Sequence, residues 1–317
     1  MTTAQPNIQA NAQPNTQPNI QFSAEQLAQL DTLPKSKLTG KPVLHFVHAN
    51  GVPSPTYLPI LERLEKYFTI ERIDKLGTHP NYPVDNHWQS LTRQVGDSID
   101  DACYKHGVPT VVAVGHSVGA MTTMQTLLAN PKPISQAILL DPSLLTGKNS
   151  LMWHLAKTAD SKLNRIPALA NRMIDKLSPA GKSKYRKDTF NSYDDAYQAL
   201  RDKPLFRPFD ERCFRLYIQH GFVPTADGKV TLAIPKAIEV AIFRTIPSLY
   251  WYKSISPKRP LTIIAGKDSH FTRIGSYKDA EHKFGLTVRY VDGEHMFPLE
   301  RPDAISDEIL ATILRQL

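Results

Sequence analysis

A continuous apolar run, residues 110–114 (TVVAV), leads without a linker into the pentapeptide GHSVG at residues 115–119. Residues 120–130 (AMTTMQTLLAN) follow at once and have the composition of a helix that stops before Pro131. An uninterrupted apolar run of this length is typical of a strand that is covered on both faces. A buried strand that becomes a helix within five residues predicts a sharp turn that presents the Ser117 hydroxyl at the edge of a sheet.

Further strand-like and helix-like segments alternate on both sides of this turn. Residues 88–106 carry one apolar stripe with helical spacing, and residues 301–317 carry another, with Pro302 near its first turn. Strands that alternate with helices form parallel sheets covered on both faces, so we expect an α/β fold with a mostly parallel, twisted sheet flanked by helices. The other expected strands are residues 43–48, 68–74, 137–140, 261–266 and 286–293.

The alternation is interrupted between residues 143 and 257. This segment consists of amphipathic helical pieces separated by prolines, with an expected turn at residues 226–229 (ADGK). An insertion of this size between two strands predicts a helical lid over the carboxyl ends of the strands, where ligands bind in open α/β sheets. The core is then expected to comprise residues 41–142 and 258–317, with the lid at 143–257.

The N-terminal 22 residues have a different character, because Asn, Gln and Pro dominate them. Such a stretch buries too little apolar surface to offset its chain entropy, which predicts a disordered tail over residues 1–22. It lacks the basic and apolar regions of a secretion leader, and no apolar run reaches 18 residues. The two cysteines, Cys103 and Cys213, predict free thiols and a cytoplasmic location.

The positive charge of the chain is concentrated in the predicted lid. The net charge is +8, and residues 143–259 hold 21 Lys and Arg against 10 Asp and Glu. The basic run at residues 182–187 is able to attract anions or an anionic membrane surface, but we expect a solvated basic face and no membrane contact. We expect no nucleic-acid partner, since aromatic residues do not alternate with the basic ones.

One serine and one histidine meet the requirements of nucleophilic catalysis. Ser117 lies at a predicted helix N-terminus, where backbone N–H groups stabilise developing negative charge. A serine hydroxyl also needs a partner that takes its proton. His295 directly follows the last predicted strand, within residues 292–298 (DGEHMFP), where a loop can bring its imidazole to Ser117. The other ten histidines lack this placement and show no metal-ligand spacing.

With these residues identified, the chain resembles the α/β-hydrolase superfamily over residues 41–317. The resemblance is carried by the elbow GHSVG and by the closing sequence GEHMFPLERP at residues 293–302. The opening HANGVP at residues 48–53 is similar to the HANGFP variant of the superfamily, and DGKVTLAIPKAIEVAIF resembles its lid segments. The resemblance implies Ser117 as nucleophile, His295 as general base and then acid, and the chain order Ser, Asp, His.

The third catalytic group, the carboxylate that orients the histidine, is ambiguous in the sequence. The superfamily usually places it in a Gly-x-x-Asp arrangement after a late strand, and here that position holds Ser269. Asp268 is one residue early and ranks first. Asp141, directly after the strand at 137–140, ranks second because some members use that site, although Asp-Pro also caps turns. Asp292 ranks third, because it lies on the same loop as His295.

The oxyanion site needs two N–H donors that point at the developing alkoxide. Val118, the residue after the nucleophile, is expected to supply one. The other is expected from the loop after His48. Asn50 is the donor if HAN corresponds to HGx in the family, and Val52 is the donor if residues 49–50 are an insertion. The sequence leaves both open.

These features predict a serine hydrolase that cleaves a carboxylic ester or a related acyl bond in a small molecule. Aromatic residues in the lid favour a substrate with an apolar part. We expect no cofactor and no metal, because the sequence has no GxGxxG after a strand, no GxxxxGK[ST] and no HExxH. Two alternatives stay open: an acyltransferase, in which an alcohol or thiol replaces water, and a non-catalytic ligand-binding protein with this fold.

Overall fold

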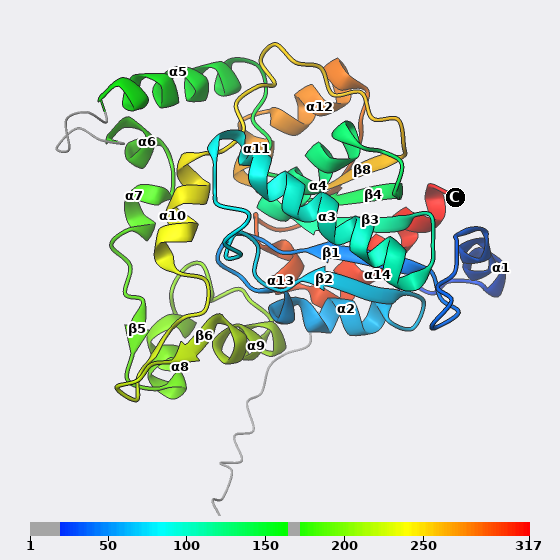
Figure 1. Cartoon of the computed structure of the whole chain (residues 1–317), viewed down its shortest axis with the longest axis horizontal. Helices are drawn as coiled ribbons and strands as arrows, with labels where there is room; N and C mark the ends of the chain where they lie inside the picture. The colour runs from blue at the N-terminus through cyan, green and yellow to red at the C-terminus, as the bar shows by residue number, and fades with distance from the viewer. Residues whose placement is uncertain (1–19, 164–171) are drawn as a thin grey trace, which may run out of the picture.

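The computed structural model describes residues 20–163 and 172–317 and is built around a six-stranded sheet (Figure 1). The strand order is β2-β1-β3-β4-β8-β9, and all neighbouring strands run parallel. The predicted α/β fold with a mostly parallel sheet flanked by helices is therefore confirmed. The strands are β1 (Val43–Val47), β2 (Thr69–Ile73), β3 (Val111–His116), β4 (Ile134–Leu140), β8 (Leu261–Gly266) and β9 (Thr287–Val291).

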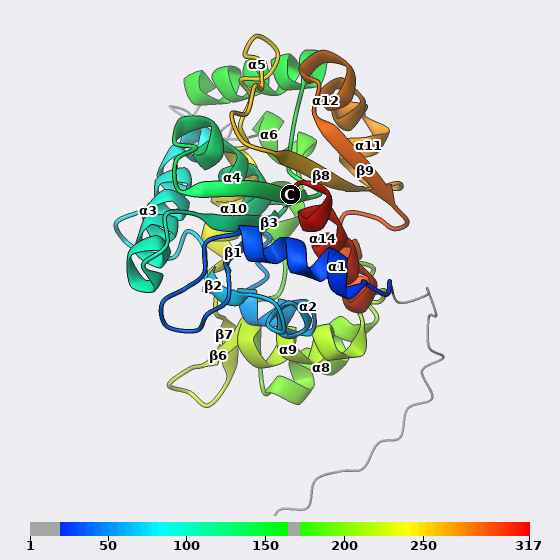
Figure 2. The same ribbon diagram turned by 90° about the vertical axis from the view of Figure 1, so that its right-hand side faces the viewer.

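Each face of the sheet supports its own hydrophobic core, because successive side chains of a strand point to opposite faces. On β1, Leu44 and Phe46 join one core, while Val43 and Val47 join the other. The first core is completed by α2 (Leu58–Leu64) and α14 (Pro302–Arg315). The second is completed by α3 (Gln89–His106), α4 (Val118–Ala129) and α12 (Ser276–Phe284). Figure 2 shows these helices on opposite sides of the sheet.

The insertion between β4 and β8 contains more than the helices that the sequence predicts. A small antiparallel sheet of order β5-β7-β6 lies within it, and the expected turn at residues 226–229 joins its strands β6 and β7. The strands are β5 (Thr189–Phe190), β6 (Phe222–Pro224) and β7 (Val230–Leu232). The helices are α5 (Gly147–Leu163), α6 (Arg172–Leu177), α7 (Ala180–Ser183), α8 (Tyr193–Arg201), α9 (Glu211–Gly221) and α10 (Lys236–Arg244).

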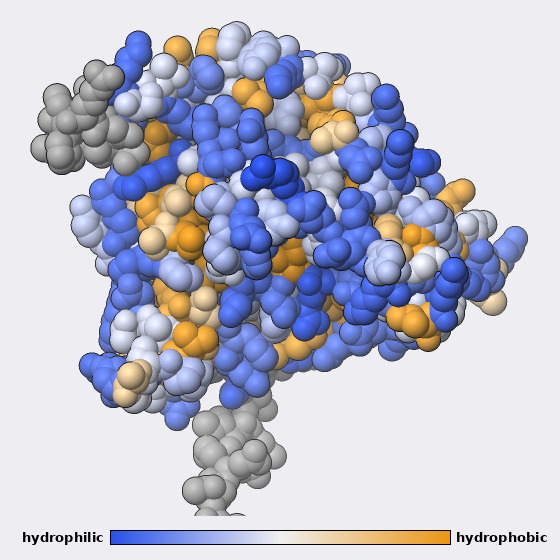
Figure 3. Space-filling model, viewed as in Figure 1, coloured by the Kyte–Doolittle hydropathy of each residue, from blue (hydrophilic) through white to orange (hydrophobic). Residues whose placement is uncertain are grey.

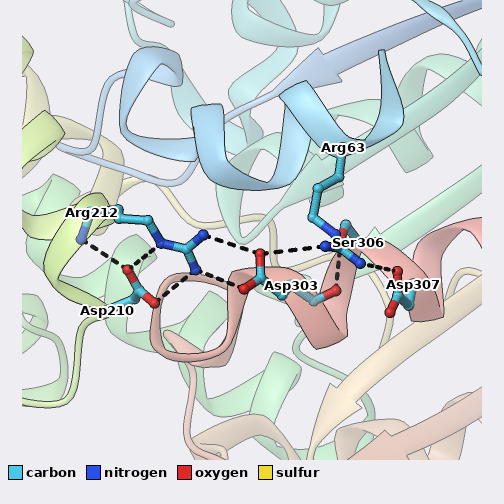
Figure 4. A network of polar contacts seen from close by, with 6 residues as sticks. All are labelled: Arg63, Asp210, Arg212, Asp303, Ser306 and Asp307. Carbon is cyan, nitrogen blue, oxygen red and sulfur yellow. Dashed lines mark hydrogen bonds and ion pairs between the residues drawn. The ribbon is translucent and has the colours of Figure 1, made fainter. Parts of the chain in front are cut away.

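The insertion, hereafter the cap, is tied to the core by a chain of charged side chains (Figure 4). The guanidinium of Arg212, on α9, pairs with Asp210 and with Asp303 on α14, at 2.9 Å in the latter case. Arg63, on α2, pairs with Asp307 of α14 at 2.8 Å. Three elements far apart in the sequence are thereby held together beside the first core.

The remaining elements are short and lie mostly at the ends of the chain or around the site. The short helices are α1 (Ala24–Ala28), η1 (Gln29–Thr32), η2 (Ser54–Tyr57), η3 (Asn86–Trp88), α11 (His270–Arg273) and α13 (Phe297–Glu300). Most of the predicted tail, residues 1–19, lies outside the described residues. Among the described helices, none combines the length and apolarity needed to cross a membrane.

Candidate active site

The turn between β3 and α4 consists of Ser117 alone, at φ 57° and ψ −115°. An L-residue in this region is strained, and such strain is typical of a nucleophile elbow. Glycines on both sides make the turn sterically feasible. A Cβ on Gly115 would lie 2.5 Å from the carbonyl carbon of Gly119, and a Cβ on Gly119 would lie 2.3 Å from the carbonyl oxygen of Val47. The elbow geometry therefore follows from the local sequence.

The Ser117 hydroxyl meets the imidazole of His295, which comes from the loop after β9. The distance from Ser117 Oγ to His295 Nε2 is 2.8 Å, and His295 Nδ1 lies 2.6 Å from Oδ2 of Asp141. The Asp141 carboxylate accepts a hydrogen bond from Nδ1–H of His295, which leaves the Nε2 lone pair free to accept the Ser117 proton. Ser117 and Asp141 are buried, and His295 is partly exposed. The three side chains have the arrangement of a nucleophile, its base and the group that orients the base.

The geometry reverses the order in which the sequence ranks the candidate acids. Asp141 follows β4 directly and contacts His295, whereas the Asp268 side chain is exposed and makes no contact with His295 among the described residues. Only the backbone of Asp268 is engaged there, through a hydrogen bond from its amide to the carbonyl of Gly293. Asp292 points elsewhere and pairs with Lys267 at 2.6 Å.

Two groups from the end of β8 hold Asp141 in place, and the sequence analysis did not anticipate either. The Ser269 hydroxyl donates to Oδ2, the oxygen that also faces His295. The amide of Gly266 donates to Oδ1 at 2.9 Å. Ser269 occupies the position where the superfamily usually carries its acid, and here it forms a hydrogen bond with Asp141. The serine in the expected acid position was the only sign in the sequence that a carboxylate from another strand contacts His295.

A buried chain of hydrogen bonds links the loop after β1 to the loop that carries His295. The amide of Ala49 donates to the Tyr57 hydroxyl at 3.3 Å, which lies 2.7 Å from His116 Nδ1. His116 Nε2 lies 2.9 Å from the backbone oxygen of His295. Burial, with a smaller effect from neighbouring His295, lowers the pKa of His116 to about 3, so its ring is neutral. The neutral ring donates from Nε2 to the carbonyl and accepts at Nδ1 from Tyr57.

The amides near Ser117 distinguish between the two expected oxyanion donors on the loop after β1. The amide of Val52 already donates to the carbonyl of Ala49 at 3.1 Å. The amide of Asn50 has no acceptor among the described residues, and neither does that of Val118 at the first turn of α4. The hydrogen bonds therefore favour the amides of Asn50 and Val118 as the pair of free donors, because the amide of Val52 is already used in a turn with Ala49.

The cap contacts this loop directly. The side-chain amide of Asn50 donates to the backbone oxygen of Glu239, on α10, at 3.0 Å. The Glu239 carboxylate pairs with Arg186 and lies so close to Gly51 that a Cβ there would sit 2.8 Å from it. A second hydroxyl, that of Ser143 at the start of the cap, lies 3.2 Å from Ser117 Oγ. The cap therefore borders both the nucleophile and the loop that carries the free amide.

The described residues contain no cluster of three or more His, Cys, Asp or Glu side chains arranged to hold a metal. Cys103 and Cys213 are free thiols. Burial raises the pKa of Cys103 to about 11 and raises that of Cys213 further, so both are protonated at neutral pH. A protonated thiol is a poor nucleophile.

Comparison with known proteins adds a family and several relatives. The profile of the α/β hydrolase fold family matches residues 81–302. Ethanol acetyltransferase 1 of Wickerhamomyces ciferrii is 32 % identical over 84 residues, which span 24 % of this chain and only 21 % of the acetyltransferase.

Solved structures resemble most of the chain but at low sequence identity. E-2-(acetamidomethylene)succinate hydrolase superposes with a TM-score of 0.64 at 17 % identity, covering 88 % of this chain and 93 % of that one. The thioesterase domain from the curacin biosynthetic pathway gives 0.60 at 18 % identity, covering 87 % and 93 %. At such identities the likeness establishes a shared fold.

Proposed function

Because the chain belongs to the α/β hydrolase fold family, we propose that it is a serine hydrolase that cleaves a carboxylic ester or related acyl bond through an acyl-enzyme on Ser117. The observation that carries the proposal is the continuous hydrogen-bonded path from Ser117 Oγ through His295 to Asp141, at 2.8 Å and 2.6 Å. Fold alone would not support it, since many functions share this architecture.

In the acylation half of the reaction, Ser117 Oγ attacks the carbonyl carbon while its proton passes to His295 Nε2. The carbonyl oxygen becomes an oxyanion, which the amides of Val118 and Asn50 stabilise. Asp141 stabilises the imidazolium and keeps the proton on Nδ1. The tetrahedral intermediate then expels the alcohol, which takes the proton from Nε2, and the acyl group remains on Ser117.

In the deacylation half, water takes the place of the departed alcohol. His295 Nε2 removes a proton from water, the resulting hydroxide adds to the acyl carbon, and a second oxyanion forms at the same amides. Its collapse breaks the bond to Ser117 Oγ, which recovers the proton from His295. The products are a carboxylic acid and the unmodified enzyme, so the reaction needs no oxidant or reductant.

We assign the cap the role of a lid over this site. Its α10 contacts the loop that carries Asn50, and its first residues carry Ser143 beside the nucleophile. Its aromatic residues are mostly buried, and they belong to the same buried cluster as the first core of the sheet. The buried cap aromatics include Phe190, Phe206, Phe209, Phe214 and Phe222.

A second candidate, acyl transfer to an alcohol, is favoured by the local similarity to ethanol acetyltransferase 1. The first half-reaction would be the same. In the second half, an alcohol would lose its proton to His295 and attack the acyl-enzyme, so that an ester is released in place of an acid. The two candidates differ only in the acceptor.

The test is hydrolysis of a short p-nitrophenyl ester together with labelling by a fluorophosphonate probe. Ser117→Ala should abolish both. Ser143→Ala is the matched control, because its hydroxyl lies only 3.2 Å from that of Ser117, and it should keep the labelling. Added ethanol should divert most of the acyl group to an ethyl ester if transfer is the function, and only a minor share if hydrolysis is. Full activity in Ser117→Ala would refute the mechanism, and absence of turnover and labelling in the intact chain would favour the ligand-binding alternative.

A further inference from the structure

One face of the cap exposes a set of large apolar side chains. They come from three segments: α5, α6 and the turn after Tyr250. We call this surface the apolar cap face. Its residues and their exposed fractions are Met152 59 %, Leu155 58 %, Met173 43 %, Leu177 56 %, Trp251 42 % and Tyr252 56 %. Large exposed apolar patches on proteins mark surfaces that contact a partner or a membrane.

These segments lie side by side and form one surface. The carboxylate of Asp160, on α5, accepts hydrogen bonds from the amides of Met173 and Ile174 and so fixes the start of α6. The ring of Trp251 lies 6.1 Å from that of His154 on α5. Figures 1 and 2 both show α6 next to α5, and Figure 3 shows apolar side chains among polar ones along the edge formed by α5.

The exposed charged side chains that α5, α6 and the turn after Tyr250 contribute to the apolar cap face are lysines, and the nearby carboxylate of Asp279, on α12, pairs with Lys283 at 2.9 Å. Exposed lysines stand among the apolar residues, and they form no ion pair with any described residue. The two carboxylates of α5 and α6 do not oppose them: Asp160 is buried as a helix cap, and Asp175 pairs with Lys184 and Arg244. Residues 245–259 contain no Asp or Glu. The lysines are Lys148, Lys162, Lys176 and Lys253.

We propose that the apolar cap face binds peripherally to the surface of an anionic lipid membrane. Apolar side chains bury shallowly between headgroups, Trp and Tyr favour this interfacial depth, and Lys is attracted to anionic headgroups while its alkyl stem lies along apolar surface. Composition alone did not lead us to expect this contact, because it does not reveal which apolar residues are exposed.

A second copy of the chain fits this surface less well than a membrane does. A two-fold interface would bring the same patch against itself, so Lys148 and Lys176 would face lysines across the contact. An anionic bilayer offers opposite charge over the whole face. The apolar cap face is connected to the site through the chain, because α5 begins six residues after Asp141 and Thr146 forms a β-bridge with Tyr250. The binding does not depend on catalysis.

The test is flotation of the full chain with vesicles of phosphatidylcholine, with and without phosphatidylglycerol. We expect binding to the mixed vesicles, little binding to pure phosphatidylcholine, and loss of binding at about 1 M salt, where the screening length falls to about 3 Å. The double variant Met152→Ser/Leu155→Ser should bind several-fold more weakly. Lys148→Gln and Lys176→Gln should each lower the partition coefficient about fivefold.

Matched controls lie elsewhere on the surface. Tyr104→Ser removes a side chain that is 92 % exposed on α3, and Lys66→Gln removes an exposed lysine after α2. Both should bind vesicles like the parent chain, and all variants should keep its thermal midpoint. Three outcomes would overturn the proposal. The first is equal binding to both vesicle types, and the second is an equal loss of binding in the control variants. The third is a dimer, seen in light scattering, that Leu155→Ser dissociates. Activity towards a soluble ester should be unchanged in these variants, so failure here is separate from failure of the proposed function.

Discussion

Replacing Asp141 by Asn is the sharpest test of the site, because it changes charge and hydrogen bonding without changing shape. The Asp141 carboxylate accepts from three donors: the amide of Gly266 at Oδ1, and the Ser269 hydroxyl and His295 Nδ1 at Oδ2. An Asn side chain has one acceptor oxygen and one NH2 group. In either orientation the NH2 group therefore faces another donor.

The size of the effect follows from which donor is left facing the NH2 group. If it faces His295, the imidazole accepts at Nδ1 and is protonated at Nε2, so it cannot take the Ser117 proton. If it faces Gly266, the correct tautomer survives, but the imidazolium loses its charged partner at 2.6 Å. We expect kcat to fall by about 10³- to 10⁴-fold, or about 4 to 5 kcal/mol of transition-state stabilisation.

The assay is steady-state hydrolysis of a p-nitrophenyl ester, with Asp268→Asn as the matched control. The Asp268 side chain is exposed and makes no contact with His295 among the described residues, so the control should keep its activity within about twofold. Circular dichroism should show both variants folded. A loss in Asp268→Asn together with an active Asp141→Asn would refute the assignment of the acid.

Three further predictions test the elbow, the acid's partner and the buried histidines. Gly119→Ala should prevent stable folding, because its Cβ would lie 2.3 Å from the backbone oxygen of Val47, and the thermal unfolding transition should be lost. Gly96→Ala is the control and should be tolerated, because its Cβ would have its closest contact at 3.7 Å. Ser269→Ala should lower kcat about tenfold with an unchanged fold, because Asp141 loses a donor, and equal kcat values would contradict this. Burial lowers the pKa of four histidines well below the 6.5 of the unfolded chain, so the unfolded state takes up protons first as the pH falls. The free energy of unfolding should therefore fall by up to about 5 kcal/mol per pH unit between about pH 6 and pH 4.5, and a flat series of urea titrations would refute this. The histidines are His45, His48 and His87, with pKa values of about 4, and His116, at about 3.

The elbow and the strands were predictable because their signals are local. The run at 110–114 marks a buried strand, and the glycines at 115 and 119 fit a turn that tolerates no Cβ. The ends of the strands were less exact. The structure extends β3 through His116 and starts β4 at Ile134, three residues before the predicted start. Residues of mixed polarity at those ends carry no periodic signal.

The acid and the buried hydrogen-bond chain could not be derived from sequence, because both depend on loops that meet only in the folded chain. Asp141 and His295 are 154 positions apart, and Tyr57 and His116 are 59 apart. No spacing rule ranks Asp268 below Asp141. The small sheet of the cap was missed for a different reason, since strands of two or three residues, one of them ending in Pro224, are too short for alternation to appear.

The position of the acid has a consequence for how the cap relates to the site. Asp141 directly follows β4 and Ser117 directly follows its neighbour β3, so the pairing of these two strands sets the positions of both residues. The cap begins immediately afterwards, and any movement of α5 would pull on the residues next to Asp141. The buried hydroxyl of Tyr277, on core helix α12, donates to the Pro142 carbonyl at 2.9 Å. This bond anchors the chain between Asp141 and the cap, immediately beside the contact between Asp141 and His295.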